Sequence, residues 1–267
     1  MRMWYQSLTR PAAWVAYNES LRAVLDSAKD AGTTIEVHGI ERRGGVGDQY
    51  RYLEFIEAGE VLENVERATR EGFDAFLIGN IADPGLREAR EITDMPVLGL
   101  GELSVHLANM MGGSFAIVTG NAKHAPKIIE NITRYGLREK LVGVRRMSVD
   151  RLVDLNEGFA NPTAGRALID EFLAAAAAVV DEGAEIVIPA VGVLMTLLAR
   201  HGVHEVRAGI PILNGVTALV KMGEAAVKMR ALCGGSWTSR RATYAAPPLD
   251  QIAELRSFYG PVYPFLR

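Results

Sequence analysis

The sequence predicts a doubly wound α/β protein with mainly parallel strands, built from two similar halves that face each other across a cleft. Short runs rich in β-branched residues alternate with longer helical stretches along most of the chain, a pattern typical of parallel strands joined by helical crossovers. The runs Phe76–Ile78 and Ile186–Ile188 contain no polar residue, as expected of strands covered on both faces. Two longer stretches that resemble each other indicate an internal duplication.

The expected strands are short, apolar and bounded by glycine, proline or charged residues. They cover Arg2–Tyr5, Ile35–Gly39, Ala75–Ile78, Val97–Leu100, Phe115–Thr119, Glu185–Ile188 and Ile210–Leu213. The expected helices are longer stretches with apolar residues three and four positions apart. They cover Ala12–Ala31, Leu53–Glu71, Leu86–Ile92, Leu103–Met111, Lys123–Tyr135, Thr163–Glu182, Val193–His201 and Val216–Leu232.

Composition narrows the class of protein. The 267 residues suit one large domain or two compact ones, and 49% apolar with 23% charged residues is ordinary for a globular protein. No apolar run approaches the roughly 20 residues that span a membrane, and Met1–Gln6 lead directly into a strand, so no signal peptide is expected. The net charge of −3 gives no reason to expect nucleic acid. The single cysteine, Cys233, rules out an intramolecular disulfide and favours a reducing cytoplasm.

The duplication relates the stretches Glu71–Asn80 and Glu182–Val191. In both, Glu-Gly ends a helix, an acidic residue follows two positions later, and an apolar strand comes next. The alternative is that any two strand–helix–strand units look alike. Ligands bind beyond the carboxyl ends of parallel strands, so Asn80 and Val191 are expected on opposite walls of one cleft. The predicted domains are residues 1–100 with 213–267, and residues 101–212.

Several motifs carry a family resemblance. Asp83–Leu86 follows a strand, Pro96–Glu102 spans the next strand, and Phe115–Thr119 forms another; Ile188–Leu194 and Pro211–Val216 belong to the second half. Their order and spacing resemble the aspartate/glutamate/hydantoin racemase superfamily, especially its hydantoin racemase branch. The resemblance implies two α/β domains in a pseudo-twofold arrangement and no cofactor.

The same resemblance implies two cysteines, one per half, that act as base and acid on opposite faces of a carbon beside a carbonyl. The chain departs from this pattern at both positions, which hold Asn80 and either Val191 or Ala190. An amide only donates or accepts hydrogen bonds, and valine or alanine cannot transfer a proton, so two-thiol racemisation is not expected. Cys233 follows the last long helix and is interpreted as structural or incidental.

Two candidate sites lie after strands of the first half. Asn80 is a candidate to orient a carbonyl or carboxylate; the alternative is a turn residue bonded to its own backbone. Gln6 and Ser7, with Thr9 nearby, follow the first strand and precede a helix, and they are candidates for substrate contact. For Ser7 or Thr9 the alternative is capping of that helix.

Candidate acid–base residues come from three other places. Glu102 and His106 are four residues apart at the start of a helix and share a face, so they form a candidate acid–base pair. The alternative is that Glu102 stabilises the helix N-terminus and His106 lies on the surface or at an interface. His38 ends the second strand and is either a third candidate or a satisfied core histidine. His201 and His204 lack a third ligand nearby, so no metal site is expected.

Two loops are candidate holders of a carboxylate or amide. Thr119, Gly120 and Asn121 end a strand before a helix, and Asn214 with Gly215 is their counterpart in the other half. Backbone N–H groups at such positions bind anions; the alternative is a pair of plain turns.

The remaining predictions concern the cleft wall, a loop and the tail. Val191 and Gly192 are expected to line the apolar wall. The loop Gly44–Gly47, followed by Asp48, lacks the spacing of a dinucleotide fingerprint and is a candidate lid. The aromatic tail Ser236–Arg267 is expected to pack on the body or on a neighbouring subunit, which favours a homo-oligomer.

These features favour an enzyme of the racemase superfamily with altered, cysteine-free chemistry on a small carboxylate or cyclic amide, as an isomerase, lyase or hydrolase. The arylmalonate decarboxylase branch, which is similar to this family but uses one cysteine, indicates that the scaffold admits lyase chemistry. One alternative is an amino-acid or hydantoin racemase with non-thiol bases. The other is a non-catalytic small-molecule binding protein that kept the pocket.

Overall fold

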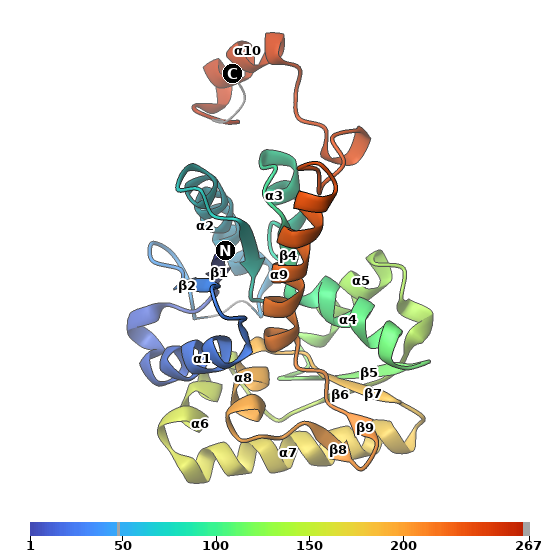
Figure 1. The fold of residues 1–267 in the computed structure, drawn as a ribbon. Coiled ribbons are helices and arrows are strands. Elements are labelled where there is room, and N and C mark those ends of the chain that lie inside the picture. The colour runs from blue at the N-terminus through green and yellow to red at the C-terminus, as the bar shows by residue number, and fades with distance from the viewer. Residues whose placement is uncertain (47–48, 264–267) are drawn as a thin grey trace.

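The computed structural model describes residues 1–46 and 49–263, and within them two parallel sheets and one short antiparallel pair (Figure 1). The first sheet has the order β2-β1-β3-β4 and the second the order β6-β5-β7. The strands of these sheets are β1 (Arg2–Gln6), β2 (Thr34–His38), β3 (Ala75–Ile78), β4 (Val97–Gly99), β5 (Phe115–Thr119), β6 (Leu141–Arg146) and β7 (Ile186–Pro189). The antiparallel pair joins β8 (Glu205–Arg207) to β9 (Ile210–Pro211). The predicted α/β class with mainly parallel strands is confirmed.

Helices connect the strands and cover the sheets. They are α1 (Val15–Ala28), α2 (Arg51–Arg70), α3 (Leu86–Ile92), α4 (Leu100–Met111), α5 (Ala125–Arg134), α6 (Glu157–Ala160), α7 (Pro162–Asp181), α8 (Gly192–Arg200), α9 (Gly215–Leu232) and α10 (Leu249–Tyr259). Short 3₁₀ turns add η1 (Pro11–Ala13), η2 (Arg138–Lys140), η3 (Leu152–Asn156) and η4 (Ala242–Tyr244). Figure 1 shows α7 beneath the second sheet and α9 running along the first.

The strand order repeats between the halves. β1 lies between β2 and β3 with all pairings parallel, and β5 lies between β6 and β7 in the same way. β3 then pairs with β4, and β7 makes a parallel bridge from Val187 to Ile212. The two halves therefore share one topology, which supports the internal duplication.

Both faces of the first sheet are buried. Met3 and Leu77 face the same hydrophobic cluster as residues of α1 and α9, whereas Trp4 and Phe76 pack against α2 and α3. Successive strand residues point to opposite faces, so a continuous apolar run is what a sheet covered on both sides requires. Each such fully buried large side chain stabilises the fold by about 1.5–3 kcal/mol.

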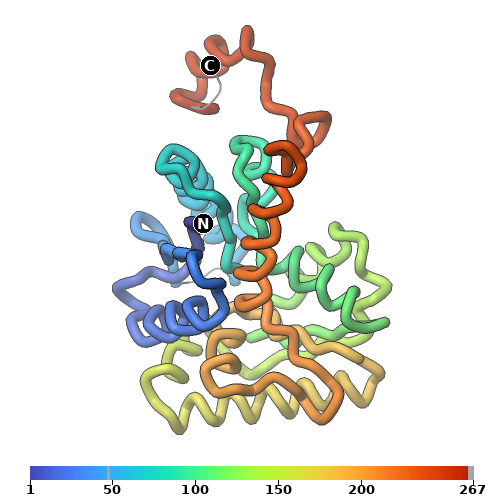
Figure 2. Tube along the Cα trace, in the orientation of Figure 1, coloured from blue at the N-terminus to red at the C-terminus, as the bar shows by residue number. Residues whose placement is uncertain are grey.

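Helix α9 returns the end of the chain to the first sheet. A Cβ at Gly223 would lie 2.9 Å from Leu77 and 3.0 Å from Met3, so this glycine lets the helix approach the strands closely. Beyond α9 the chain first packs on α3, where Arg240 donates to the carbonyl oxygens of Arg90 at 2.7 Å and Glu91 at 3.2 Å. Figure 2 shows α10 set off from the two sheets. The exact domain bounds, residues 1–100 with 213–267 and residues 101–212, stay a prediction.

Several sequence predictions were wrong in detail. Strand β6 was missed because Gly143 and two arginines interrupt its apolar pattern; a Cβ at Gly143 would lie 2.9 Å from Val179 of α7, so close packing requires the glycine there. Helices α6 and α10 and strand β8 were also missed. Helix α1 begins at Val15 rather than Ala12, because Pro11 opens a separate 3₁₀ turn. Gly47, Asp48 and Phe265, which belong to the predicted lid and tail, lie outside the described residues.

Candidate functional site

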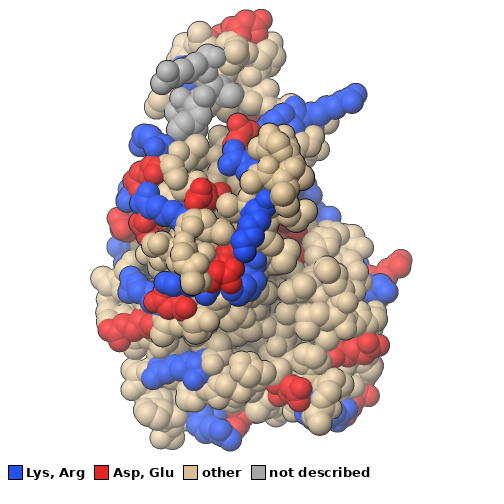
Figure 3. Space-filling view, in the orientation of Figure 1, with Lys and Arg blue, Asp and Glu red and all other residues tan. Residues whose placement is uncertain are grey.

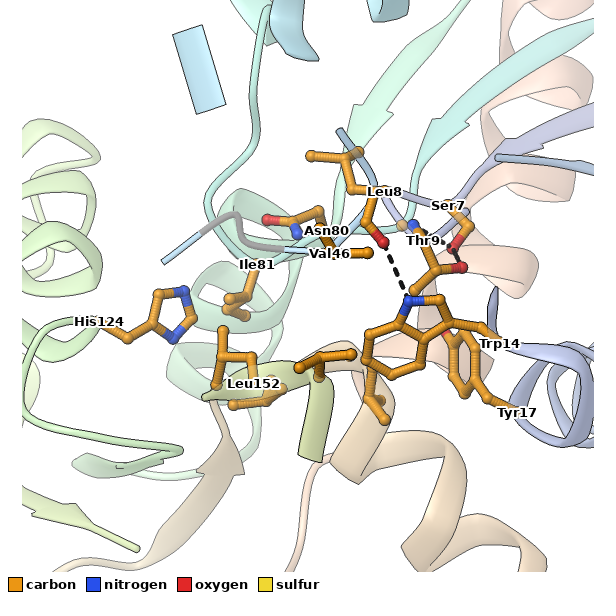
Figure 4. A pocket seen from close by; sticks show the side chains of 16 residues that line it. Ser7, Leu8, Thr9, Trp14, Tyr17, Val46, Asn80, Ile81, His124 and Leu152 are labelled. Atoms are coloured by element: carbon orange, nitrogen blue, oxygen red, sulfur yellow. Dashed lines mark hydrogen bonds between the residues drawn. The ribbon is translucent and has the colours of Figure 1, made fainter. Parts of the chain in front are cut away.

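A pocket lies where the carboxyl ends of strands from both sheets meet (Figure 4). The first half contributes the segments after β1, β2 and β3 together with the start of α1, and the second half contributes those after β5, β6 and β7. Its volume is about 40 Å³, room for a few water molecules. The lining residues are Ser7, Leu8, Thr9, Trp14, Tyr17, Gly45, Val46, Gly79, Asn80, Ile81, His124, Leu152, Val153, Val191, Gly192 and Val193.

Two glycines let the halves approach each other at this pocket. A Cβ at Gly192 would lie 3.2 Å from the carbonyl oxygen of Gly79, so the ends of β7 and β3 nearly touch there. A Cβ at Gly79 would collide with the ring of Tyr5, which is fully buried. The residues beside these glycines, Asn80 and Val191, line the same pocket from opposite halves. The structure therefore brings together the two positions that the duplication made equivalent.

Asn80 both lines the pocket and bonds to its own turn, the two alternatives expected from the sequence. Its Oδ1 accepts a hydrogen bond from the backbone N–H of Ala82 at 2.8 Å, and its carbonyl accepts one from Asp83 at 3.1 Å. These bonds form the turn after β3. Because the turn fixes the residue while it lines the pocket, the amide is held in a defined place on the wall.

Ser7 and Thr9 form a buried hydroxyl pair at the pocket. Their hydroxyl oxygens are 2.8 Å apart, and the backbone N–H of Thr9 donates to the Ser7 hydroxyl at 3.2 Å. Neither residue caps a helix, since η1 and α1 begin later and without side-chain caps. Trp14 closes this end of the pocket by donating its indole N–H to the carbonyl of Gly45 at 2.9 Å.

Gln6 lies behind the pocket rather than in it. Its Nε2 donates to the carbonyl of Ser7 at 2.9 Å, and its Oε1 accepts from Trp4 at 3.1 Å and from Asn64 at 2.9 Å. The side chain is fully buried. Gln6 therefore braces the loop that carries Ser7.

His124 lines the pocket and was missed by the sequence analysis. It is 1% exposed and directly precedes α5. The side chain of Asn121 accepts hydrogen bonds from the backbone N–H groups of Lys123 and His124, both at 3.1 Å, and so shapes the turn that presents the imidazole. Among the described lining residues, His124 and Tyr17 are the ionisable ones.

The loop Thr119–Asn121 supports the pocket without lining it. The hydroxyl of Thr119 donates to the carbonyl of Asn121 at 3.1 Å, and Asn121 Nδ2 donates to Gln49 at 3.1 Å. A Cβ at Gly120 would lie 2.5 Å from Leu152 and 3.5 Å from Val191. The loop thus backs the lining residues, and its glycine leaves room for them.

Asn214 and Gly215 lie at the N-terminus of α9 and are not lining residues. Asn214 Oδ1 accepts from the backbone N–H groups of Val216 at 3.1 Å and Thr217 at 3.3 Å, which caps the helix. A Cβ at Gly215 would collide with the hydroxyl of Ser104 in α4. Asn214 and Gly215 were predicted either to hold a carboxylate or amide or to form a plain turn. The structure shows a structural role: Asn214 caps α9, and Gly215 allows close contact with α4.

The three candidate acid–base residues lie elsewhere. Both carboxylate oxygens of Glu102 bind the guanidinium of Arg90, and His106 is exposed, with its ring 6.4 Å from that of Tyr135. His38 stacks on Trp4 with ring centroids 3.5 Å apart, and its pKa is lowered mainly by burial. Neither these histidines nor Glu102 lines the pocket with Asn80.

Asp83 lies in a second, larger cavity of about 540 Å³ between α2, α3 and α5. Its carboxylate accepts hydrogen bonds from the backbone of Gly101 at 2.8 Å and Glu102 at 2.6 Å, and from the Tyr135 hydroxyl at 2.6 Å. Burial raises the pKa of Asp83 to about 7, while these three donors oppose the rise. Asp83 therefore ties the turn after Asn80 to the N-terminus of α4 and to the second half.

Three wider observations concern possible partners. In residues 1–46 and 49–263, no three histidine, cysteine or acidic side chains converge as a metal site would require. No helix of the described chain has the length and apolar character to cross a membrane. On the face drawn in Figure 3, basic and acidic side chains are interspersed rather than gathered by sign.

The chain is similar to known racemases in both sequence and fold. The family model described as Asp/Glu/Hydantoin racemase matches residues 11–223. The hydantoin racemase of Pseudomonas sp. (strain NS671) is 28% identical over 255 residues, 93% of this chain and 94% of the relative. The hydantoin racemase of Rhizobium meliloti is 31% identical over 193 residues, 72% of this chain and 74% of the relative. Allantoin racemase from Klebsiella pneumoniae superposes with a TM-score of 0.73 at 24% identity, over 93% of this chain and 94% of that one. The predicted resemblance is confirmed, and the chain belongs to the Asp/Glu/hydantoin racemase family.

Proposed function

We propose that this racemase-superfamily enzyme acts on a small carboxylate or cyclic amide by chemistry that uses no thiol. The observation that carries the proposal is the lining of the pocket. Its described residues include no cysteine, and the one cysteine of the chain, Cys233, is exposed at the end of α9. The polar side chains that do line it are hydroxyls, one amide, one imidazole and the indole of Trp14.

These groups suit hydrogen bonds to a carbonyl or carboxylate, and a ring the size of a hydantoin requires the pocket of about 40 Å³ to open. The hydroxyl pair of Ser7 and Thr9 and the amide of Asn80 both donate and accept hydrogen bonds. Val191, on the other half, presents methyl groups, which exclude water and strengthen each polar contact nearby. Because one half offers hydrogen bonds and the other mostly apolar surface, the reaction is asymmetric: the substrate is oriented from one side and confined from the other.

Two other readings of the pocket have support. The hydantoin racemases that are 28% and 31% identical to this chain favour an amino-acid or hydantoin racemase. Such an enzyme would need non-thiol bases here because no cysteine is among the described lining residues. The small, largely apolar pocket is equally compatible with a binding protein that does not turn its ligand over. These alternatives differ in one measurable property, which is what happens to the hydrogen at the stereocentre.

The test uses single enantiomers of hydantoins, allantoin and amino acids, together with arylmalonates, which are prochiral. Each is incubated with the protein in D₂O and followed by NMR and chiral chromatography, alongside a thermal-shift screen that detects binding with or without turnover. We expect turnover that falls at least tenfold in Asn80→Ala and Ser7→Ala and is unchanged in Cys233→Ser. Loss of turnover in Cys233→Ser, or unchanged turnover in the two pocket variants, would contradict the proposal. Binding without turnover across the panel favours the binding protein.

Assembly and location complete the proposal. Leu249, Phe258 and Tyr259 of α10 are 60%, 78% and 73% exposed, and Figure 2 shows α10 set off from the two sheets. Such a helix suits contact with a second subunit, which supports a homo-oligomer. The single cysteine supports a cytoplasmic location.

A further inference from the structure

The pocket has two chemically different ends. Figure 4 places His124 at one end and Ser7 with Thr9 at the other, with Ile81 and Leu152 between them. The hydroxyls at the far end bond to each other. Imidazole is the side chain whose protonation ordinarily changes near neutral pH. The end occupied by His124 is therefore the place in the described lining where a proton is most readily given or taken.

We propose that His124 is the single acid–base group of this site and that it serves one face of the substrate only. This inference rests on the proposed function and adds the residue that moves the proton. The second ionisable residue of the lining, Tyr17, packs edge-on against Trp14 and Phe159 at 5.7 and 5.4 Å on the far side of the pocket. Asn80 has an amide, which holds a carbonyl but does not accept a proton from carbon.

The chemical step balances with His124 alone. The neutral imidazole takes the proton from the carbon beside the carbonyl. The C–H electron pair forms the C=C bond of an enolate, and the carbonyl π pair moves onto the oxygen. Hydrogen-bond donors at Asn80 and the hydroxyl pair stabilise that negative oxygen. The imidazolium then returns a proton to the same carbon, where the C=C pair re-forms a C–H bond and the oxygen pair re-forms the carbonyl. With His124 alone this cycle is a hydrogen exchange rather than a net isomerisation.

Stereochemistry follows from having one proton-transfer group. An imidazolium that loses its proton to D₂O during the enolate lifetime returns deuterium to the face from which the proton left. The product then carries deuterium but keeps its configuration. Inversion would require a donor on the opposite face, as in the two-cysteine arrangement of the family pattern.

The position of His124 in the fold fits this role. A turn that Asn121 closes with two hydrogen bonds to the backbone presents the imidazole to the pocket. The side chain lies among the apolar Ile81 and Leu152 (Figure 4), where a proton acceptor acts with little competition from water.

The test compares His124→Ala and His124→Gln with His106→Ala, which removes an exposed histidine outside the pocket. Deuterium exchange is measured with the substrate found in the panel described above, and ligand binding by thermal shift. We expect exchange to fall roughly 100-fold or more in both His124 variants, with ligand binding retained in His124→Gln and exchange unchanged in His106→Ala. Added imidazole should restore exchange in His124→Ala, increasingly so as pH rises through the pKa of imidazole.

The outcomes separate this inference from the function on which it rests. Exchange within threefold of wild type in a folded His124→Gln protein, or wild-type racemisation at equal rates from both enantiomers, overturns the role of His124 while leaving a thiol-free enzyme. Binding without exchange also overturns it. Dependence of turnover on Cys233 instead overturns the proposed function itself.

Discussion

Replacing Asp83 by asparagine tests how this buried carboxyl is protonated in the folded protein. Burial raises the pKa of Asp83 from its ordinary 3.8 to about 7. The folded state therefore holds the proton more tightly than the unfolded chain does. The stability that comes from this group is fully present below the unfolded pKa of 3.8 and is lost as pH rises through about 7. A rise of about three pH units corresponds to roughly 4 kcal/mol as an upper bound.

The assay is urea unfolding of wild type and Asp83→Asn at pH values from 5 to 8. Asparagine keeps the size of the side chain but does not titrate, so the free energy of unfolding of wild type should fall relative to the variant by up to about 1.4 kcal/mol per pH unit between pH 5 and 7. Asp150→Asn, which changes an exposed acid, should keep the wild-type slope. Equal slopes for wild type and Asp83→Asn would refute the reasoning. The three donors and the α4 N-terminus would then outweigh burial and keep the carboxylate ionised.

Three other perturbations test the packing, the pocket rim and the assembly. Gly79→Ala should lower the free energy of unfolding by about 1–3 kcal/mol because its methyl meets a buried tyrosine ring. The matched change Gly59→Ala, in open space within α2, should raise the free energy of unfolding by about 0.5–1 kcal/mol. Urea unfolding in which both variants shift the free energy in the same direction would contradict the packing argument. Trp14→Phe removes the 2.9 Å hydrogen bond to Gly45 at the edge of the pocket and should weaken ligand binding about fivefold, near 1 kcal/mol. An unchanged affinity, measured by calorimetry, would show that this hydrogen bond does not contribute to binding. Phe258→Asp should lower the mass measured by light scattering if α10 joins subunits, and an unchanged mass speaks against that contact.

The strands and helices of the core could be predicted from local patterns. Apolar runs such as Phe76–Ile78 are long enough to be identified as strands from the sequence. They are buried on both faces, as their composition predicts. Strand β6 was not predicted because the reason for its glycine is a contact between distant segments. Gly143 is needed in the strand because α7 packs closely against it. The tail helix α10 was not predicted because Ile252 is the one residue of it that is buried, so its sequence lacks the broad apolar stripe of the core helices.

The candidate site was predicted in part. The duplication led to Asn80 and Val191, and the position after β1 led to Ser7, and all three line the pocket. Gln6 does not, because neighbouring residues at a strand end point in different directions. Glu102 was chosen for its spacing from His106, but its carboxylate is bound by Arg90 from a different helix, a contact that helix periodicity does not reveal.

The sequence by itself determined the fold class, the repeated topology and the absence of a cysteine pair, because these depend on residue types and on patterns along the chain. Only the tertiary structure decided which polar groups meet. His124 reaches the pocket through a turn closed by Asn121 and through the docking of two sheets at Gly79 and Gly192. Both depend on contacts between segments far apart in the chain, and the chemistry of the pocket between Asn80 and Val191 depends on them as well.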